Sequence, residues 1–123
     1  MSDDLSAAHL VSLDDALLVT LPEAMQDGGI ECLIATIGDR IVATASRKVV
    51  IDTSRTRFID SFMGRTLSAV ASVAHLLGAE TTMVGLRPEV AITLVELGMK
   101  LSGISTALTI EQALARQPGD SGG

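Results

Sequence analysis

The sequence has 123 residues and contains no tryptophan and no tyrosine, and Phe58 and Phe62 are its only aromatic residues. Without tyrosine or tryptophan, the chain does not resemble a binding surface of the antibody type. Apolar residues still make up 47% of the sequence, and most of them are Ala, Val, Leu and Ile. That share is too high for a disordered chain and indicates an aliphatic core of helices packed on a sheet.

Basic residues are scarce, since nine Lys and Arg face fifteen Asp and Glu and leave a formal charge of −6. Nucleic acids and anionic membranes are bound through an excess of Lys and Arg, so both are poor partners. No apolar run approaches the roughly 20 residues that span a bilayer. The acidic start at residues 1–5 lacks the features of a signal peptide, so we expect a cytoplasmic protein.

Cys32 is the only cysteine, which excludes an internal disulfide and a cluster of thiolate metal ligands. Its apolar surroundings in the sequence predict an inert, partly buried side chain. His9 and His75 are far apart and suggest no catalytic triad. The glycines do not have the spacing of a phosphate-binding loop. We therefore expect no catalytic residue, no metal site and no cofactor.

The hydrophobic pattern predicts one α/β domain over residues 8–116, with flexible termini at 1–7 and 117–123. Strands are expected at 9–13, 16–21, 49–52, 81–86 and 106–110, and helices at 30–45, about 63–77, 88–97 and 111–116. The first two strands are close enough to pair as an antiparallel hairpin. The later strands alternate with about four helices, so the rest of the mixed sheet should be largely parallel. The segment 49–52 should be covered on both faces, because three of its consecutive residues are apolar.

Three apolar stripes define the faces of the predicted helices that point to the core. They are Ile30, Ile34, Ile37, Ile41 and Ala45; Met63, Leu67, Val70, Ala74 and Leu77; and Val90, Ala91, Leu94, Val95 and Leu97. Gly78 and Gly98 follow two of these stripes and are suited to end the helices in a left-handed conformation.

Ser61 lies where the loop after a predicted strand becomes a helix. Such a position is exposed and sits at the positive end of a helix dipole, where a phosphate finds free backbone N–H groups. A purely structural alternative, which position alone favours, is that Asp60 or Ser61 simply caps the helix. The two interpretations are compatible. Arg55, Arg57 and Arg65 surround the loop, either as solvated charges or as a patch that meets an acidic partner.

A second hypothesis is a receiver-like domain phosphorylated on Asp52, with Asp60 completing a Mg²⁺ site. The acidic pair Asp14 and Asp15 precedes a strand instead of following one, and no suitably placed lysine follows the later strands. Asp52 could instead accept a hydrogen bond from the loop backbone in an Asx-turn.

Three segments together resemble a known family. Residues 49–54 followed by 58–65 resemble the phosphoacceptor region of STAS domains, the fold of anti-sigma-factor antagonists. Residues 76–80 resemble the end of that fold's second helix, and 85–98 resemble the branch represented by RsbS, the small STAS protein of the stressosome. The Asp-Ser-Phe sequence at Asp60 to Phe62 points to the same branch. The resemblance covers residues 8–116.

The resemblance implies a non-enzymatic phospho-switch and scaffold. Ser61 aligns with the serine that an RsbT-type kinase phosphorylates. The unmodified protein, assembled with RsbR-like STAS proteins in homo- and hetero-oligomers, would hold that kinase and release it on phosphorylation, and an RsbX-like phosphatase would reset the state. The partner-binding residues would be Asp60, Ser61, Phe62, Met63, Gly64 and Arg65. The alternative is a STAS module that binds a nucleotide or small ligand in a cleft between the loops that follow residues 49–51 and 81–85.

Overall fold

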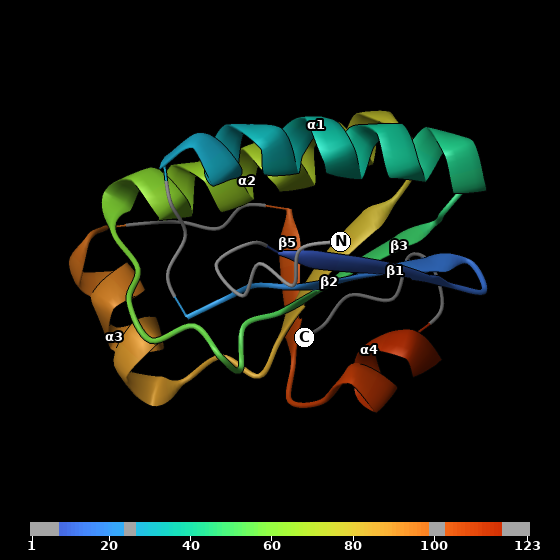
Figure 1. The fold of residues 1–123 in the computed structure, drawn as a ribbon. Coiled ribbons are helices and arrows are strands. Elements are labelled where there is room, and N and C mark those ends of the chain that lie inside the picture. The colour runs from blue at the N-terminus through green and yellow to red at the C-terminus, as the bar shows by residue number, and fades with distance from the viewer. Residues whose placement is uncertain (1–7, 24–26, 99–102, 117–123) are drawn as a thin grey trace.

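The computed structural model describes residues 8–23, 27–98 and 103–116. These residues form β1 (His9–Leu13), β2 (Ala16–Thr20), α1 (Asp27–Thr44), β3 (Lys48–Asp52), α2 (Ser61–Leu76), β4 (Glu80–Val84), α3 (Pro88–Glu96), β5 (Ile104–Ala107) and α4 (Ile110–Ala115). The strands form one sheet in the order β1-β2-β3-β4-β5, with β1 antiparallel to β2 and the other pairs parallel (Figure 1). The predicted mixed sheet is therefore confirmed. The termini predicted to be flexible lie outside the described residues.

Helices α1 and α2 cover one face of the sheet, and the short α4 covers part of the other (Figure 1). Successive residues of a strand point to opposite faces. Val49 and Ile51 of β3 accordingly pack in the larger cluster beneath α1 and α2, whereas Val50 packs with Val84 and with Ala113 of α4. Val49, Val50 and Ile51 are all buried, which confirms the prediction that β3 is covered on both faces.

Four of the five residues of the predicted α2 stripe, Met63, Leu67, Val70 and Ala74, are in the core. Leu77 is 40% exposed at the C-cap of the helix, so its place in the stripe was wrong.

In α1, Ile37 and Ile41 are in the core and Ile34 packs against it, as predicted, and Leu33 joins them. The side chain of Ile30 lies outside the part of the chain that the structure describes. Ala45 is exposed and lies beyond the helix end with φ 51°. Cys32 is exposed, so the prediction of a partly buried cysteine was wrong.

Helix α3 buries only Val90 and Leu94 of its described residues. Val95 and Leu97, which were expected in the core, are 77% and 43% exposed. The helix begins at Pro88 as predicted, and Gly98 follows its end with φ 69°. The stripe is narrower than predicted because α3 lies at one end of the molecule and buries only one side (Figure 1).

The last strand ends earlier than predicted, since Thr109 caps α4 instead of extending β5. The Thr109 hydroxyl accepts a hydrogen bond from the Gln112 amide at 3.1 Å. The Gln112 side-chain carbonyl in turn accepts one from the Leu108 amide at 3.0 Å. This reciprocal pair of hydrogen bonds is close to a capping box, and its Thr-x-x-Gln signature is present in the sequence. Here the cap, and not the β-branched residues, determines where the strand ends.

Candidate functional site

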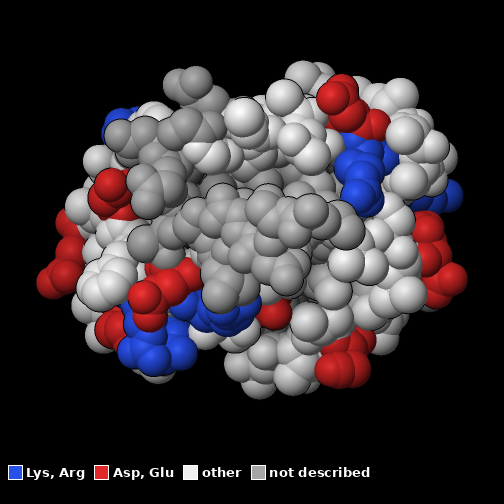
Figure 2. All heavy atoms as spheres, in the orientation of Figure 1, with Lys and Arg blue, Asp and Glu red and all other residues white. Residues whose placement is uncertain are grey.

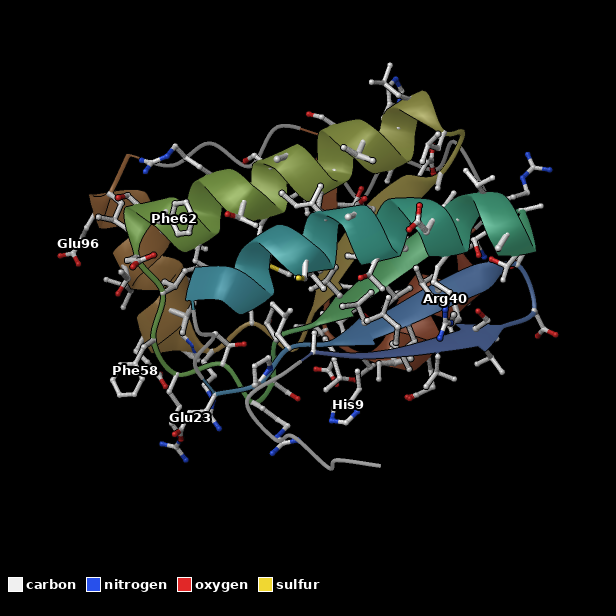
Figure 3. All side chains as sticks on the ribbon, turned by 45° about the horizontal axis from the view of Figure 1, so that its top comes forward. His9, Glu23, Arg40, Phe58, Phe62 and Glu96 are labelled. Carbon is white, nitrogen blue, oxygen red and sulfur yellow. The ribbon has the colours of Figure 1, made fainter. Side chains whose placement is uncertain are left out.

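The loop that joins β3 to α2, residues 53–60, carries the candidate site and is called the acceptor loop below. It leaves the carboxyl end of β3 and delivers Ser61 as the first residue of α2. The start of α3 lies at the same end of the molecule (Figures 1 and 3). The carboxyl ends of parallel strands are where α/β sheets place their functional loops.

Asp60, and not Ser61, caps α2. Asp60 has an extended backbone, and its carboxylate accepts a hydrogen bond from the Met63 amide at 2.8 Å. The Asp60 carbonyl also accepts from the Gly64 amide at 3.0 Å. Ser61 therefore does not cap the helix. The sequence alone could not decide which of the two residues has that role.

The Ser61 side chain is half-buried, and its hydroxyl makes no hydrogen bond to any other residue that the structure describes. The first amides of a helix lack partners within the helix and carry its positive partial charge. A phosphate on Ser61 would meet those amides, but it would also lie one residue from the Asp60 carboxylate. The position thus combines an available hydroxyl with an electrostatic environment that a phosphate would change.

Replacing Asp60 with alanine is expected to lower the free energy of unfolding by about 1 kcal/mol, because the Met63 amide loses its acceptor. Asp60→Asn keeps a side-chain oxygen at the same place and should retain most of that stability. Urea denaturation of the three proteins measures the difference. An alanine variant as stable as the wild type would show that the cap contributes nothing.

The residues around Ser61 divide into exposed and buried ones. Asp60, Phe62 and Arg65 lie on the surface, whereas Met63 is in the core and Gly64 is buried. Of the residues predicted to bind a partner, Met63 and Gly64 therefore contribute to the fold of α2 and not to its accessible surface.

Phe58 was not among the residues predicted to bind a partner, although its side chain is 69% exposed. The signal for it was available, since the chain has only two aromatic residues and both flank Ser61.

The acceptor loop is fastened to β4 at its start. The Thr53 amide and hydroxyl both donate to the Val84 carbonyl at 2.9 Å. The Ser54 amide donates to the Asp52 carboxylate at 2.9 Å, which confirms the predicted Asx-turn. Asp52 therefore has a structural role in shaping this turn.

The middle of the acceptor loop is tied to the segment after β2. The Thr56 hydroxyl donates to the Pro22 carbonyl at 3.3 Å, and the Arg57 Nε lies 3.0 Å from a Glu23 carboxylate oxygen. Arg57 thus forms an ion pair with Glu23 in which both side chains are more than half exposed. Arg55 and Arg65 are exposed as well. On the face shown in Figure 2, basic side chains lie beside acidic ones. The arrangement does not support a basic patch made of all three arginines.

The geometry argues against the two other hypotheses, a receiver-like domain and a ligand-binding STAS module. A receiver domain of the flavodoxin-like type has the strand order 2-1-3-4-5, whereas this sheet has the order 1-2-3-4-5 with an antiparallel first strand. The ligand-binding alternative needs a cleft between the loops after β3 and β4. Those loops touch, because a Cβ added to Gly85 would lie 2.9 Å from the Ser54 Cβ. No group of three or more His, Cys, Asp or Glu side chains among the described residues is placed to hold a metal ion.

Comparison with known proteins agrees with this architecture. The family model described as STAS domain matches residues 7–113. A serine-to-glutamate variant of Moorella thermoacetica RsbS superimposes with a TM-score of 0.75 at 32% identity, covering 87% of this chain and 91% of that chain. A chain from the molecular architecture of the stressosome, a signal integration and transduction hub, gives 0.75 at 33% identity, covering 86% and 92%.

The curated relatives include RsbT co-antagonist proteins of Bacillus subtilis. RsbRC is 36% identical over 74 residues, which are 58% of this chain and 26% of that protein. RsbRD is 26% identical over 117 residues, which are 95% of this chain and 42% of that protein. The chain thus spans less than half the length of these relatives. Within its described residues, no helix combines the length and the apolar character needed to cross a membrane.

Proposed function

The chain belongs to the STAS domain family, and from that premise we propose that it is an RsbS-like, non-enzymatic phospho-switch that works inside an assembly of STAS proteins. In this role it binds an RsbT-type serine kinase together with RsbR-like proteins. Phosphorylation of Ser61 releases the kinase, and an RsbX-like phosphatase restores the unmodified state. The observation that carries the proposal is the half-buried Ser61 hydroxyl, which makes no hydrogen bond to a described residue and lies at the start of α2 between two exposed aromatic side chains.

The switch follows from the charge that a phosphate adds. Phosphorylation places close to two negative charges on Ser61. The Asp60 carboxylate already accepts the Met63 amide, so the new group competes with it for the amides of the first turn. A partner packed over Phe58 and Phe62 would have to desolvate the phosphate beside the carboxylate. The cost of desolvating the phosphate arises in the complex and not in the free protein. Phosphorylation therefore favours release of the partner.

The experiment that tests this proposal is phosphopeptide mass spectrometry after incubation with the RsbT-type kinase of the same organism and Mg-ATP. Wild type should acquire one phosphate on Ser61, and pull-down should show that the kinase leaves as the phosphate accumulates. Ser61→Ala should acquire none and keep the kinase bound. Ser54→Ala, which changes another exposed serine close to the same site, is the matched control and should behave like wild type.

The proposal fails if wild type acquires no phosphate, or if Ser61→Ala is phosphorylated to the same level. It also fails if the phosphate appears on Ser61 while the kinase stays bound. In that last case Ser61 would be a substrate without being a switch.

A further inference from the structure

Arg87 makes a contact that neither the cap of α2 nor the phosphate chemistry explains. It occupies the N-cap position of α3, but its side chain caps nothing there. Its Nε donates a hydrogen bond to the Ser54 carbonyl at 3.0 Å. The guanidinium therefore joins the loop after β4 to the acceptor loop, across 33 residues of sequence.

The contact falls on an exposed turn of the acceptor loop. Ser54 and Arg55 form an exposed turn between the buried side chains of Thr53 and Thr56. The bonds of Thr53 fix the start of the loop, and those of Thr56 and Arg57 fix its middle. Among the described residues, Arg87 supplies the side-chain hydrogen bond that reaches the turn from the neighbouring loop.

We propose that Arg87 is a positioning residue for phosphorylation of Ser61, an inference that rests on the proposed function. Its Nε–H holds the exposed turn of the acceptor loop in the conformation that presents Ser61 to the kinase. Its ion pair with Glu89 is a poor candidate for the same task, because the atoms are 3.7 Å apart and the side chains are 34% and 62% exposed. The hydrogen bond to Ser54, and not the charge, carries the effect.

The kinetic consequence depends on how much of the protein is in the presenting conformation. If that fraction falls to about one fifth, the apparent KM for the protein substrate rises about fivefold, while kcat for the bound substrate is unchanged. A contact between Arg87 and the kinase itself would also raise KM. A useful test therefore has to separate the hydrogen-bond donor of Arg87 from its charge.

Two substitutions make that separation. In Arg87→Gln, the amide nitrogen occupies the chain position of the arginine Nε, so the donor is kept and the charge is lost. Arg87→Met has a stem of similar length without a donor. We expect Arg87→Met to raise KM for Ser61 phosphorylation about fivefold with kcat within about twofold of wild type, and Arg87→Gln to stay within about twofold on both. Glu89→Gln, which removes only the ion pair, should match wild type.

Hydrogen exchange of the unphosphorylated full chain gives a second readout that needs no kinase. Amides of residues 53–60 should exchange faster in Arg87→Met than in Arg87→Gln or wild type, while the amides of the β3 and β4 core keep their rates. If Arg87→Met and Arg87→Gln raise KM equally and leave loop exchange unchanged, Arg87 acts by charge and the proposal is overturned. If wild type is not phosphorylated at all, the proposed function fails, and loop exchange alone decides the role of Arg87.

Discussion

Gly85→Ala is expected to lower the free energy of unfolding by about 3 kcal/mol, a large effect for one added methyl group. Two costs combine at this position. Gly85 has φ 69°, a left-handed conformation that an L side chain adopts at a cost. The added Cβ would also lie 2.9 Å from the Ser54 Cβ and 3.3 Å from the Asp52 Oδ1, so the two loops would have to separate. Urea denaturation with a fixed m-value measures the loss.

Gly98→Ala is the matched control for this prediction. Gly98 has the same φ of 69°, but a Cβ added there meets no atom of the described residues within 4 Å. Its substitution should cost only the left-handed backbone conformation of an L residue, about 1 kcal/mol. The difference between the two variants isolates the contact between the loops after β3 and β4. Equal losses at the two glycines would show that Ser54 moves aside without cost.

The elements that could be predicted from the sequence are those whose signals are local. The stripe from Met63 to Ala74 specifies a helix face by itself, and Pro88 and Gly98 mark the ends of α3 through their backbone preferences. Where two local signals compete, the stronger one decides. The pattern near the end of the chain predicts a strand that continues to residue 110. The strand ends earlier because the Thr109 hydroxyl accepts a hydrogen bond as the N-cap of α4.

The sequence predicted that Ser61 lies where the acceptor loop becomes a helix, but not which contacts surround it. Asp and Ser have nearly equal preference for the N-cap, so the sequence cannot distinguish Asp60 from Ser61 in that role. The bonds that hold the acceptor loop join residues far apart in the chain, such as Arg87 to Ser54 and Arg57 to Glu23. No periodic pattern encodes such pairs. They follow from the parallel order of β2, β3 and β4, which brings the ends of these strands to one edge.

Alanine at Phe58 or at Phe62 is expected to weaken binding of the RsbT-type kinase by about thirtyfold each, while leaving the fold intact. The rings are 69% and 40% exposed and lie at the end of the molecule where α2 begins (Figure 3). Exposed aromatic side chains at the centre of an interface are typical hot spots, with losses of about 2 kcal/mol on truncation. Titration calorimetry measures the affinity, and urea denaturation measures the stability of each variant.

The contrast between affinity and stability is what makes this prediction specific. A buried phenylalanine would lose about 3 to 5 kcal/mol of stability on truncation to alanine, whereas these two should lose less than about 1 kcal/mol. Leu76→Ala is the matched control, because Leu76 is 83% exposed at the opposite end of α2. It should change neither quantity. Kinase affinity that is unaffected in both phenylalanine variants would place the partner on another face and leave two exposed rings beside Ser61 without a role.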